Sequence, residues 1–238
     1  MCETIKPSSW DQGGILRDIF TITRTVDNAV DAVLDSPAKM WDNSKMNQII
    51  YNSFPRSGNV YSGLLSRYFF DSMYATVHIP EIFSVKELDN VVIFRKPEDA
   101  ISSLINKQSM SSIKLEINEI TNLAISNSEL YRSYMSYAKI NKDNIYIGKF
   151  EDLIANTINH FENVAKKFDR KLSLDYESKF KNAQFSGKLW EDKHDGHIPR
   201  EKDEVRLDIE EKVGSLNIIK ELNREYEEFI FEYQTKVK

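Results

Sequence analysis

The chain has 238 residues and a mass of 27.7 kDa, and its 41% of hydrophobic residues can fill the core of one α/β domain. Its net charge of −5 and its pI of about 5.5 argue against a general nucleic-acid binder, so an anion site must be a local basic pocket. A single cysteine, Cys2, excludes an internal disulfide framework and a cysteine metal cluster.

The start of the sequence is polar and carries no apolar signal core. No run approaches the roughly 20 apolar residues that a membrane span needs. We therefore expect a soluble protein of a reducing compartment, the cytoplasm, with no membrane span and no nucleic-acid partner.

Residues 1–45 are predicted to form an N-terminal helical arm. Apolar residues recur at helical spacing between Gly14 and Leu34, and the Ser36-Pro37 pair is typical of a helix end. The apolar positions of this helix are Ile15, Ile19, Ile22, Val26, Val30 and Val33. The helix packs on the domain that follows or on another protein, and we favour packing within the chain.

Residues 46–238 are predicted to form a single α/β domain. Short apolar, β-prone runs predict strands, and apolar residues at helical spacing predict the helices between them. The predicted strands are 46–54, 74–79, 91–94 and 144–150, and the predicted helices are 59–70, a segment from about 97, 113–140 and 153–168. This alternation predicts a parallel β-sheet flanked by helices. Ligands of such sheets bind beyond the carboxyl ends of the strands, where Arg56, His78 and Arg95 fall.

The last part of the chain is predicted to hold a lid and C-terminal helices. Residues 176–200 are less regular and contain Gly187, Gly196 and Pro199, as expected of a lid. Residues 204–236 are charged and helical in pattern, with an apolar stripe of Leu216, Ile219, Leu222, Tyr226, Phe229 and Tyr233.

The loop after the first predicted strand is a candidate anion site. Its sequence is Pro55-Arg56-Ser57-Gly58-Asn59-Val60-Tyr61, and a helical pattern begins within it. The first turn of a helix presents unpaired N–H groups and the positive end of its dipole, and Arg56 adds a fixed charge that suits phosphate or sulfate. The glycine permits a tight turn. The alternative is an ordinary strand-to-helix turn with a capping serine.

Two further segments carry candidate site residues. Arg95 closes a predicted strand and Ser103 lies about two helical turns beyond it, so both side chains could meet a second phosphate. Arg95 could instead pair with Glu98 or Asp99. His78 lies at the end of another strand, where an imidazole suits general-base chemistry near neutral pH, although a lone histidine is more often structural.

The order and spacing of these segments resemble the cytosolic-type sulfotransferase family. Members carry Pro-Lys-Ser-Gly-Thr-Thr-Trp, then His-Leu-Pro, then a strand that ends in arginine with a serine eight residues on, then Tyr-Glu-Asp-Leu. The matching segments here, within about 47–170, are Pro55–Tyr61, His78-Ile79-Pro80, Arg95 with Ser103, and Phe150-Glu151-Asp152-Leu153.

The resemblance implies a P-loop-like sulfotransferase fold and a reaction. The donor would be 3′-phosphoadenosine 5′-phosphosulfate (PAPS), the product 3′-phosphoadenosine 5′-phosphate (PAP), and no metal would be needed. His78 would be the general base and Arg56 would stabilise the leaving group. The loop residues Arg56, Ser57, Gly58, Asn59, Val60 and Tyr61 would hold the 5′-phosphosulfate, and Arg95 and Ser103 the 3′-phosphate.

The chain also departs from the family pattern. The family lysine, two threonines and tryptophan are replaced by Arg56, Asn59, Val60 and Tyr61. Thr76 stands where a lysine is often found, and Phe150 lacks the hydroxyl of the family tyrosine. The late Arg-Lys-Gly loop is missing as such, and Arg200 is the residue we expect to contact the phosphate in its place.

Two other functions stay open at this stage. The substitutions in the loop fit a catalytically degenerate domain that binds a nucleotide or a partner. A P-loop-related nucleotide kinase would need a Gly-Lys-Ser/Thr loop, which the sequence lacks. The acceptor could be a small molecule, a saccharide, a lipid or a peptide, and a homodimer is one of the open oligomeric states.

Overall fold

The computed structural model describes residues 49–71, 74–86, 88–109, 115–185 and 204–236. The predicted N-terminal arm, Arg200 and most of the predicted lid lie outside these ranges. None of the helices within them is long and apolar enough to cross a membrane.

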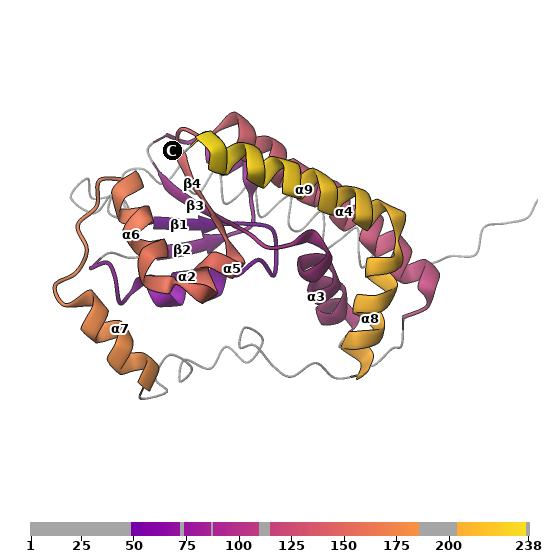
Figure 1. Ribbon diagram of the computed structural model, residues 1–238. Helices are drawn as coiled ribbons and strands as arrows, with labels where there is room; N and C mark the ends of the chain where they lie inside the picture. Colours follow the sequence, from indigo (N-terminus) through magenta and orange to yellow (C-terminus); the bar gives the residue numbers. More distant parts are fainter. Residues whose placement is uncertain (1–48, 72–73, 87, 110–114, 186–203, 237–238) are drawn as a thin grey trace, which may run out of the picture. The chain divides into compact units, whose positions relative to one another are not determined.

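A four-stranded parallel sheet forms the centre of the described domain, as predicted (Figure 1). Its order is β2-β1-β3-β4, so β1 and β3 are the inner strands. The bounds are β1 Ile49–Asn52, β2 Tyr74–Val77, β3 Asp89–Phe94 and β4 Ile145–Lys149. The inner strands are almost entirely buried, because helices cover both faces of a parallel sheet.

The alternation of side chains along β3 separates two hydrophobic clusters. Val92 and Phe94 face one cluster, while Val91 and Ile93 face the other. The first cluster is completed by α3 (Pro97–Ser109), α4 (Ile117–Ile140), α8 (Glu204–Ser215) and α9 (Asn217–Lys236). The second is completed by α2 (Asn59–Ser66), α5 (Phe150–Ala155), α6 (Thr157–Lys167) and α7 (Tyr176–Phe185). Figure 1 shows α4 and α9 running side by side.

Several predicted helices are shorter or divided. The predicted helix 153–168 is two helices, because Asn156 leaves the helical conformation and its Oδ1 caps α6 by accepting from the Asn159 N–H at 3.2 Å. A break at Leu216 separates α8 from α9. The predicted helix 59–70 ends at Ser66. The described part of the predicted lid, residues 176–185, is the helix α7, which buries Phe180 and Ala183.

An aromatic stack holds α6 and α7 to the domain. The rings of Phe69 and Phe161 lie 4.4 Å apart and nearly parallel, and Phe69 also contacts Phe180. Phe161 is fully buried.

We expect Phe161→Ala to lower the free energy of unfolding by about 3–5 kcal/mol, because the change removes a buried ring and leaves a cavity. Phe185→Ala is the matched control, since that ring is 92% exposed, and it should change the value by less than about 0.5 kcal/mol. Urea unfolding of the full chain measures both. Equal midpoints for the two variants would contradict the packing described.

Candidate active site at the carboxyl ends of β1 and β3

The loop between β1 and α2 is a tight turn that requires its glycine. The Ser57 N–H donates to the Phe54 carbonyl at 3.1 Å, and Arg56 and Gly58 adopt φ of 69° and 100°. A Cβ on Gly58 would lie 2.6 Å from Cδ2 of Phe150, so both the dihedral angle and the space exclude a side chain. The ring of Phe150, the first residue of α5, therefore packs directly against Gly58 of the loop.

Three buried polar atoms gather at this loop without a partner among the described residues. They are the Oγ of Ser57, the Oδ1 of Asn59 and the Oγ of Ser62, and each of these residues is at most 3% exposed. The two hydroxyls can each donate a hydrogen bond and the amide oxygen can accept one, so a polar group at the N-terminus of α2 would find partners here. The unpaired backbone N–H groups of the first helical turn also favour an anion at this place.

Asn59 takes a structural part in the loop. Its amide nitrogen donates to the carbonyls of Val77 at 2.9 Å and of Ser53 at 3.2 Å, which ties the start of α2 to the end of β2. Its side-chain donors are therefore used within the protein, and its backbone N–H is the group left to meet an anion.

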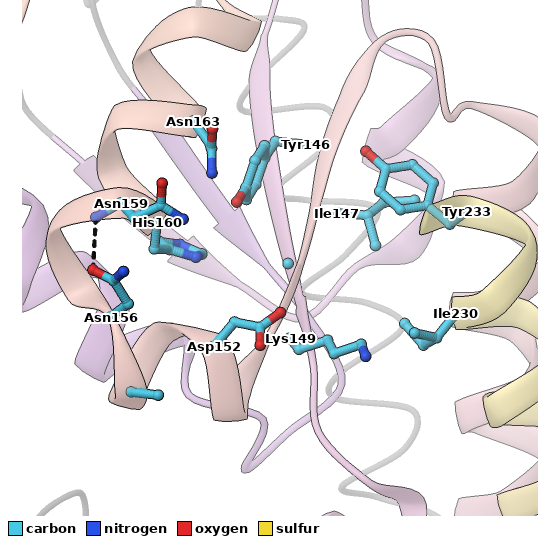
Figure 2. Close-up of a pocket in the computed structure, with 12 residues that line it drawn as sticks. Tyr146, Ile147, Lys149, Asp152, Asn156, Asn159, His160, Asn163, Ile230 and Tyr233 are labelled. Carbon is cyan, nitrogen blue, oxygen red and sulfur yellow. Dashed lines mark hydrogen bonds between the residues drawn. The ribbon is translucent and has the colours of Figure 1, made fainter. Parts of the chain in front are cut away.

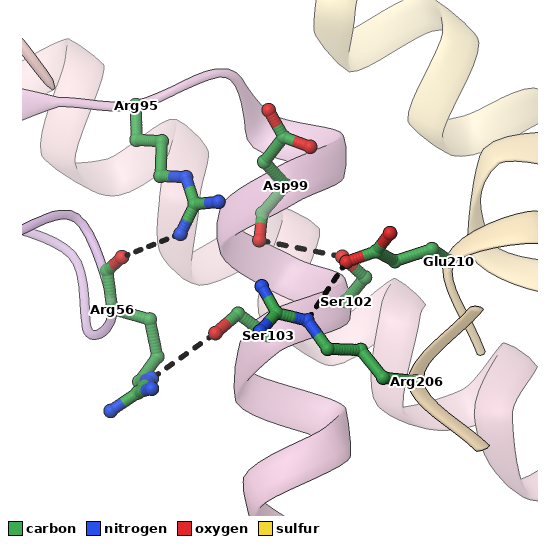
Figure 3. A network of polar contacts seen from close by, with 7 residues as sticks. All are labelled: Arg56, Arg95, Asp99, Ser102, Ser103, Arg206 and Glu210. Carbon is green, nitrogen blue, oxygen red and sulfur yellow. Dashed lines mark hydrogen bonds and ion pairs between the residues drawn. The ribbon is translucent and has the colours of Figure 1, made fainter. Parts of the chain in front are cut away.

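Arginines from three elements converge next to the loop (Figure 3). The Arg56 Nε donates to Ser103 Oγ at 3.2 Å, and the Arg95 Nη1 lies 3.5 Å from the Arg56 carbonyl. Arg206 of α8 reaches the same cluster and forms an ion pair with Glu210 at 3.0 Å. The sequence spacing predicted that Arg95 and Ser103 converge, while the contact of Ser103 in the structure is with Arg56, and Arg206 was not predicted.

Desolvation and mutual repulsion disfavour the charges of this cluster. Burial lowers the pKa of Arg56, and the charges of Arg95 and Arg206 lower it further. Burial is also the main cause that lowers the pKa of Arg95, while the charge of Asp99 acts in the opposite direction. A bound dianion would relieve this repulsion, so the cluster is poised for phosphate or sulfate.

Two aromatic residues position Arg95. The hydroxyl of Tyr131 donates to the Arg95 carbonyl, and the Arg95 guanidinium lies 5.2 Å from the centroid of the Phe150 ring. A cation above an aromatic face is stabilised by the ring quadrupole. Phe150 makes this contact with a ring that carries no hydroxyl.

His78 lies on the other side of the loop, at the end of β2. Its Nδ1 is 2.7 Å from the Ser53 carbonyl, and because a carbonyl only accepts, Nδ1 carries the proton. Nε2 is then the basic nitrogen of the neutral ring. Desolvation lowers the pKa of His78, the hydrogen bond to Ser53 raises it, and the charge of Lys107 lowers it. Because its pKa is lowered, the ring is neutral at physiological pH. The residue as a whole is exposed.

The position of His78 depends on a neighbour that sequence reasoning missed. Asn52, at the end of β1, accepts from the Ile79 N–H at 2.9 Å, and its amide donates to the Ile79 carbonyl. A polar Asn52-Ser53 pair at the end of an apolar strand was the available sequence signal.

The remaining predicted site residues are placed as follows. Val60 and Tyr61 lie in the first turn of α2, and Tyr61 is half-buried against the second core cluster. Burial raises the pKa of Tyr61. Arg200 lies outside the described residues. Within the described ranges, no group of three or more His, Cys, Asp or Glu could hold a metal ion.

No protein-family model and no curated protein sequence matches the chain. Among solved structures, the chain is similar to mouse sulfotransferase SULT7A1 complexed with PAP, with a TM-score of 0.49 and 12% identity over 79% of this chain and 84% of that one.

We expect Gly58→Ala to destabilise the protein by about 1–3 kcal/mol, because it forces a side chain into a left-handed conformation and against Phe150. Gly214→Ala is the control. Gly214 lies inside α8, where alanine favours the helix, and its Cβ would meet only the flexible end of Glu98. Thermal unfolding distinguishes them, and an unchanged melting temperature for Gly58→Ala would contradict the tight turn.

Proposed function

We propose that the protein is a PAPS-dependent sulfotransferase. The observation that carries the proposal is the convergence of Arg56, Arg95, Arg206 and Ser103 beside the N-terminus of α2, with the neutral imidazole of His78 across the same loop. This arrangement suits a donor with two separate anionic groups and an acceptor that must lose a proton. The resemblance of the motifs supports the same reading.

The cationic residues would divide the two anionic groups of the donor between them. Arg56 and the backbone N–H groups at the start of α2 would bind the 5′-phosphosulfate. Arg95 and Ser103 would bind the 3′-phosphate. Arg206 would also contact this phosphate, which in the sulfotransferase pattern is contacted by the late Arg-Lys-Gly loop. The hydrogen bond between Arg56 and Ser103 links the two subsites, which fixes the donor in one orientation.

In the transfer step, an acceptor hydroxyl or amine attacks the sulfur while His78 Nε2 takes its proton. The bond between sulfur and the bridging oxygen breaks, and the electron pair stays on the phosphate oxygen of PAP. Arg56 and the loop N–H groups would stabilise the charge that develops there. No metal is needed for this step. The acceptor class stays open among small molecules, saccharides, lipids and peptides.

We expect PAP to bind the full chain in an isothermal titration, and Arg95→Ala and Arg206→Ala each to weaken binding about 10- to 100-fold. Each change removes a charge-assisted contact to phosphate. The exposed arginines Arg67 and Arg224 supply matched controls, whose alanine variants should bind as the native chain does. Absence of PAP binding would overturn the proposed function, and tighter binding of ATP with magnesium would favour the kinase.

We expect His78→Ala to lower turnover by about 10²- to 10⁴-fold while PAP affinity stays unchanged. Turnover is measured with PAPS over a panel of hydroxyl and amine acceptors. Because the pKa of His78 is lowered, the base is neutral at pH 7, and kcat/KM should fall with a midpoint below the ordinary value of 6.5 as the pH decreases.

A nuclear magnetic resonance titration of the His78 ring tests the same pKa without an acceptor. Lys107→Met should move the midpoint upward, because a nearby positive charge is removed. Lys220→Met, an exposed change on α9, should leave it in place. PAP binding without turnover on any acceptor would support the degenerate, nucleotide-binding domain.

A further inference from the structure

A cavity of about 320 Å³ lies beside β4, at the opposite edge of the sheet from β2 and His78. It is lined by residues of β4, α5, α6 and α9 and is partly open to solvent (Figure 2). Its lining shares no residue with the arginine cluster or with the loop after β1. A volume at the lower end of the range for ligand sites suits a small molecule.

One wall of the cavity is a row of amides on α6. Asn156, Asn159 and Asn163 follow one another at spacings of three and four residues, which places them on one helical face with His160. The Oδ1 of Asn156 is used as the helix cap, while the side chains of Asn159 and Asn163 are exposed. The wall therefore offers amide donors and acceptors together.

His160 is the buried polar group of this wall. It is 3% exposed, and its Nε2 is buried without a hydrogen-bond partner among the described residues. In Figure 2 the ring extends from α6 toward β4, where it meets Tyr146 edge-on at 5.3 Å. A Cβ on Gly148 would lie 2.8 Å from Cε1 of His160, so the glycine in β4 makes room for the imidazole. Burial lowers the pKa of His160 to about 3, which keeps the ring neutral.

The facing wall is apolar and the charges at the base cancel. Ile230 and Tyr233 of α9 face the amide row. Lys149 and Asp152 contribute one positive and one negative charge. The cavity therefore combines hydrogen-bonding amides, a neutral imidazole and an apolar platform without net charge.

We propose that this cavity binds an uncharged, hydroxyl-rich ligand, chemically a sugar ring. Each hydroxyl of such a ring both donates and accepts, as the asparagine amides do, and a neutral imidazole can accept from one hydroxyl. The C–H face of the ring would lie on Tyr233 and Ile230. A hydroxyl that reached the imidazole would give the buried ring a hydrogen-bond partner, which favours binding. The proposal does not depend on sulfuryl transfer, because other residues line the cavity.

The test titrates the full chain, labelled with ¹⁵N, with glucose, galactose and N-acetylglucosamine while the His160 ring resonances are followed. At least one of these neutral sugars should bind saturably and shift them. Asn163→Leu should weaken binding about tenfold, because it removes hydrogen bonds to the ligand. Asn163 is exposed, so the change should leave the fold intact, and Asn182→Leu on α7 is the matched control with native affinity.

Three results would overturn the proposal. The first is that no neutral sugar moves the His160 resonances, with only a bound water detected beside the ring. The second is that Asn163→Leu and Asn182→Leu bind the sugar equally well. The third is that glucuronate or inorganic phosphate displaces the sugar from the cavity, which would assign an anion site to it.

Discussion

Ser53 makes the contacts on which the candidate active site depends. Its side-chain oxygen accepts from the Ile93 N–H at 2.6 Å, which binds the end of β1 to β3. Its carbonyl accepts from His78 Nδ1 and from the Asn59 amide, which connects the same point to the end of β2 and the start of α2. One buried residue thus fixes the imidazole tautomer and the loop geometry together, so the proposed base and the proposed anion cradle share one rigid support.

The arginine cluster shows how an acidic chain can build a cationic site. The whole protein carries a net charge of −5, but Arg56, Arg95 and Arg206 meet at one place, where burial and their mutual repulsion lower the pKa of Arg56. Partial burial makes their repulsion stronger than it would be in water. An anion bound at the proposed site would relieve this repulsion, and the cation–π contact with Phe150 holds the Arg95 guanidinium in place.

The sequence predicted the parallel sheet, because the strands are short apolar runs, and it predicted that Arg56, His78 and Arg95 follow the carboxyl ends of three strands. It did not predict the break at Asn156. The apolar pattern continues through this residue, but the Asn156 side chain caps α6 and so begins a new helix there. Sequence reasoning also missed Arg206 and the clamp by Asn52, because both act through contacts between segments far apart in the chain. The N-terminal arm and the role of Arg200 remain predictions, since they lie outside the described residues.

The topology explains why Arg56 and Arg95 meet at the carboxyl ends of β1 and β3. The two strands are neighbours, and their following helices leave to opposite faces: α2 joins the cluster with Val91 and Ile93, and α3 the cluster with Val92 and Phe94. Helices that diverge in this way open a crevice at the carboxyl ends of the strands. The cavity beside β4 has another origin, because it forms where an edge strand meets α6 and α9. Substitutions at that edge should therefore alter the cavity without disturbing the crevice that holds Arg56 and Arg95.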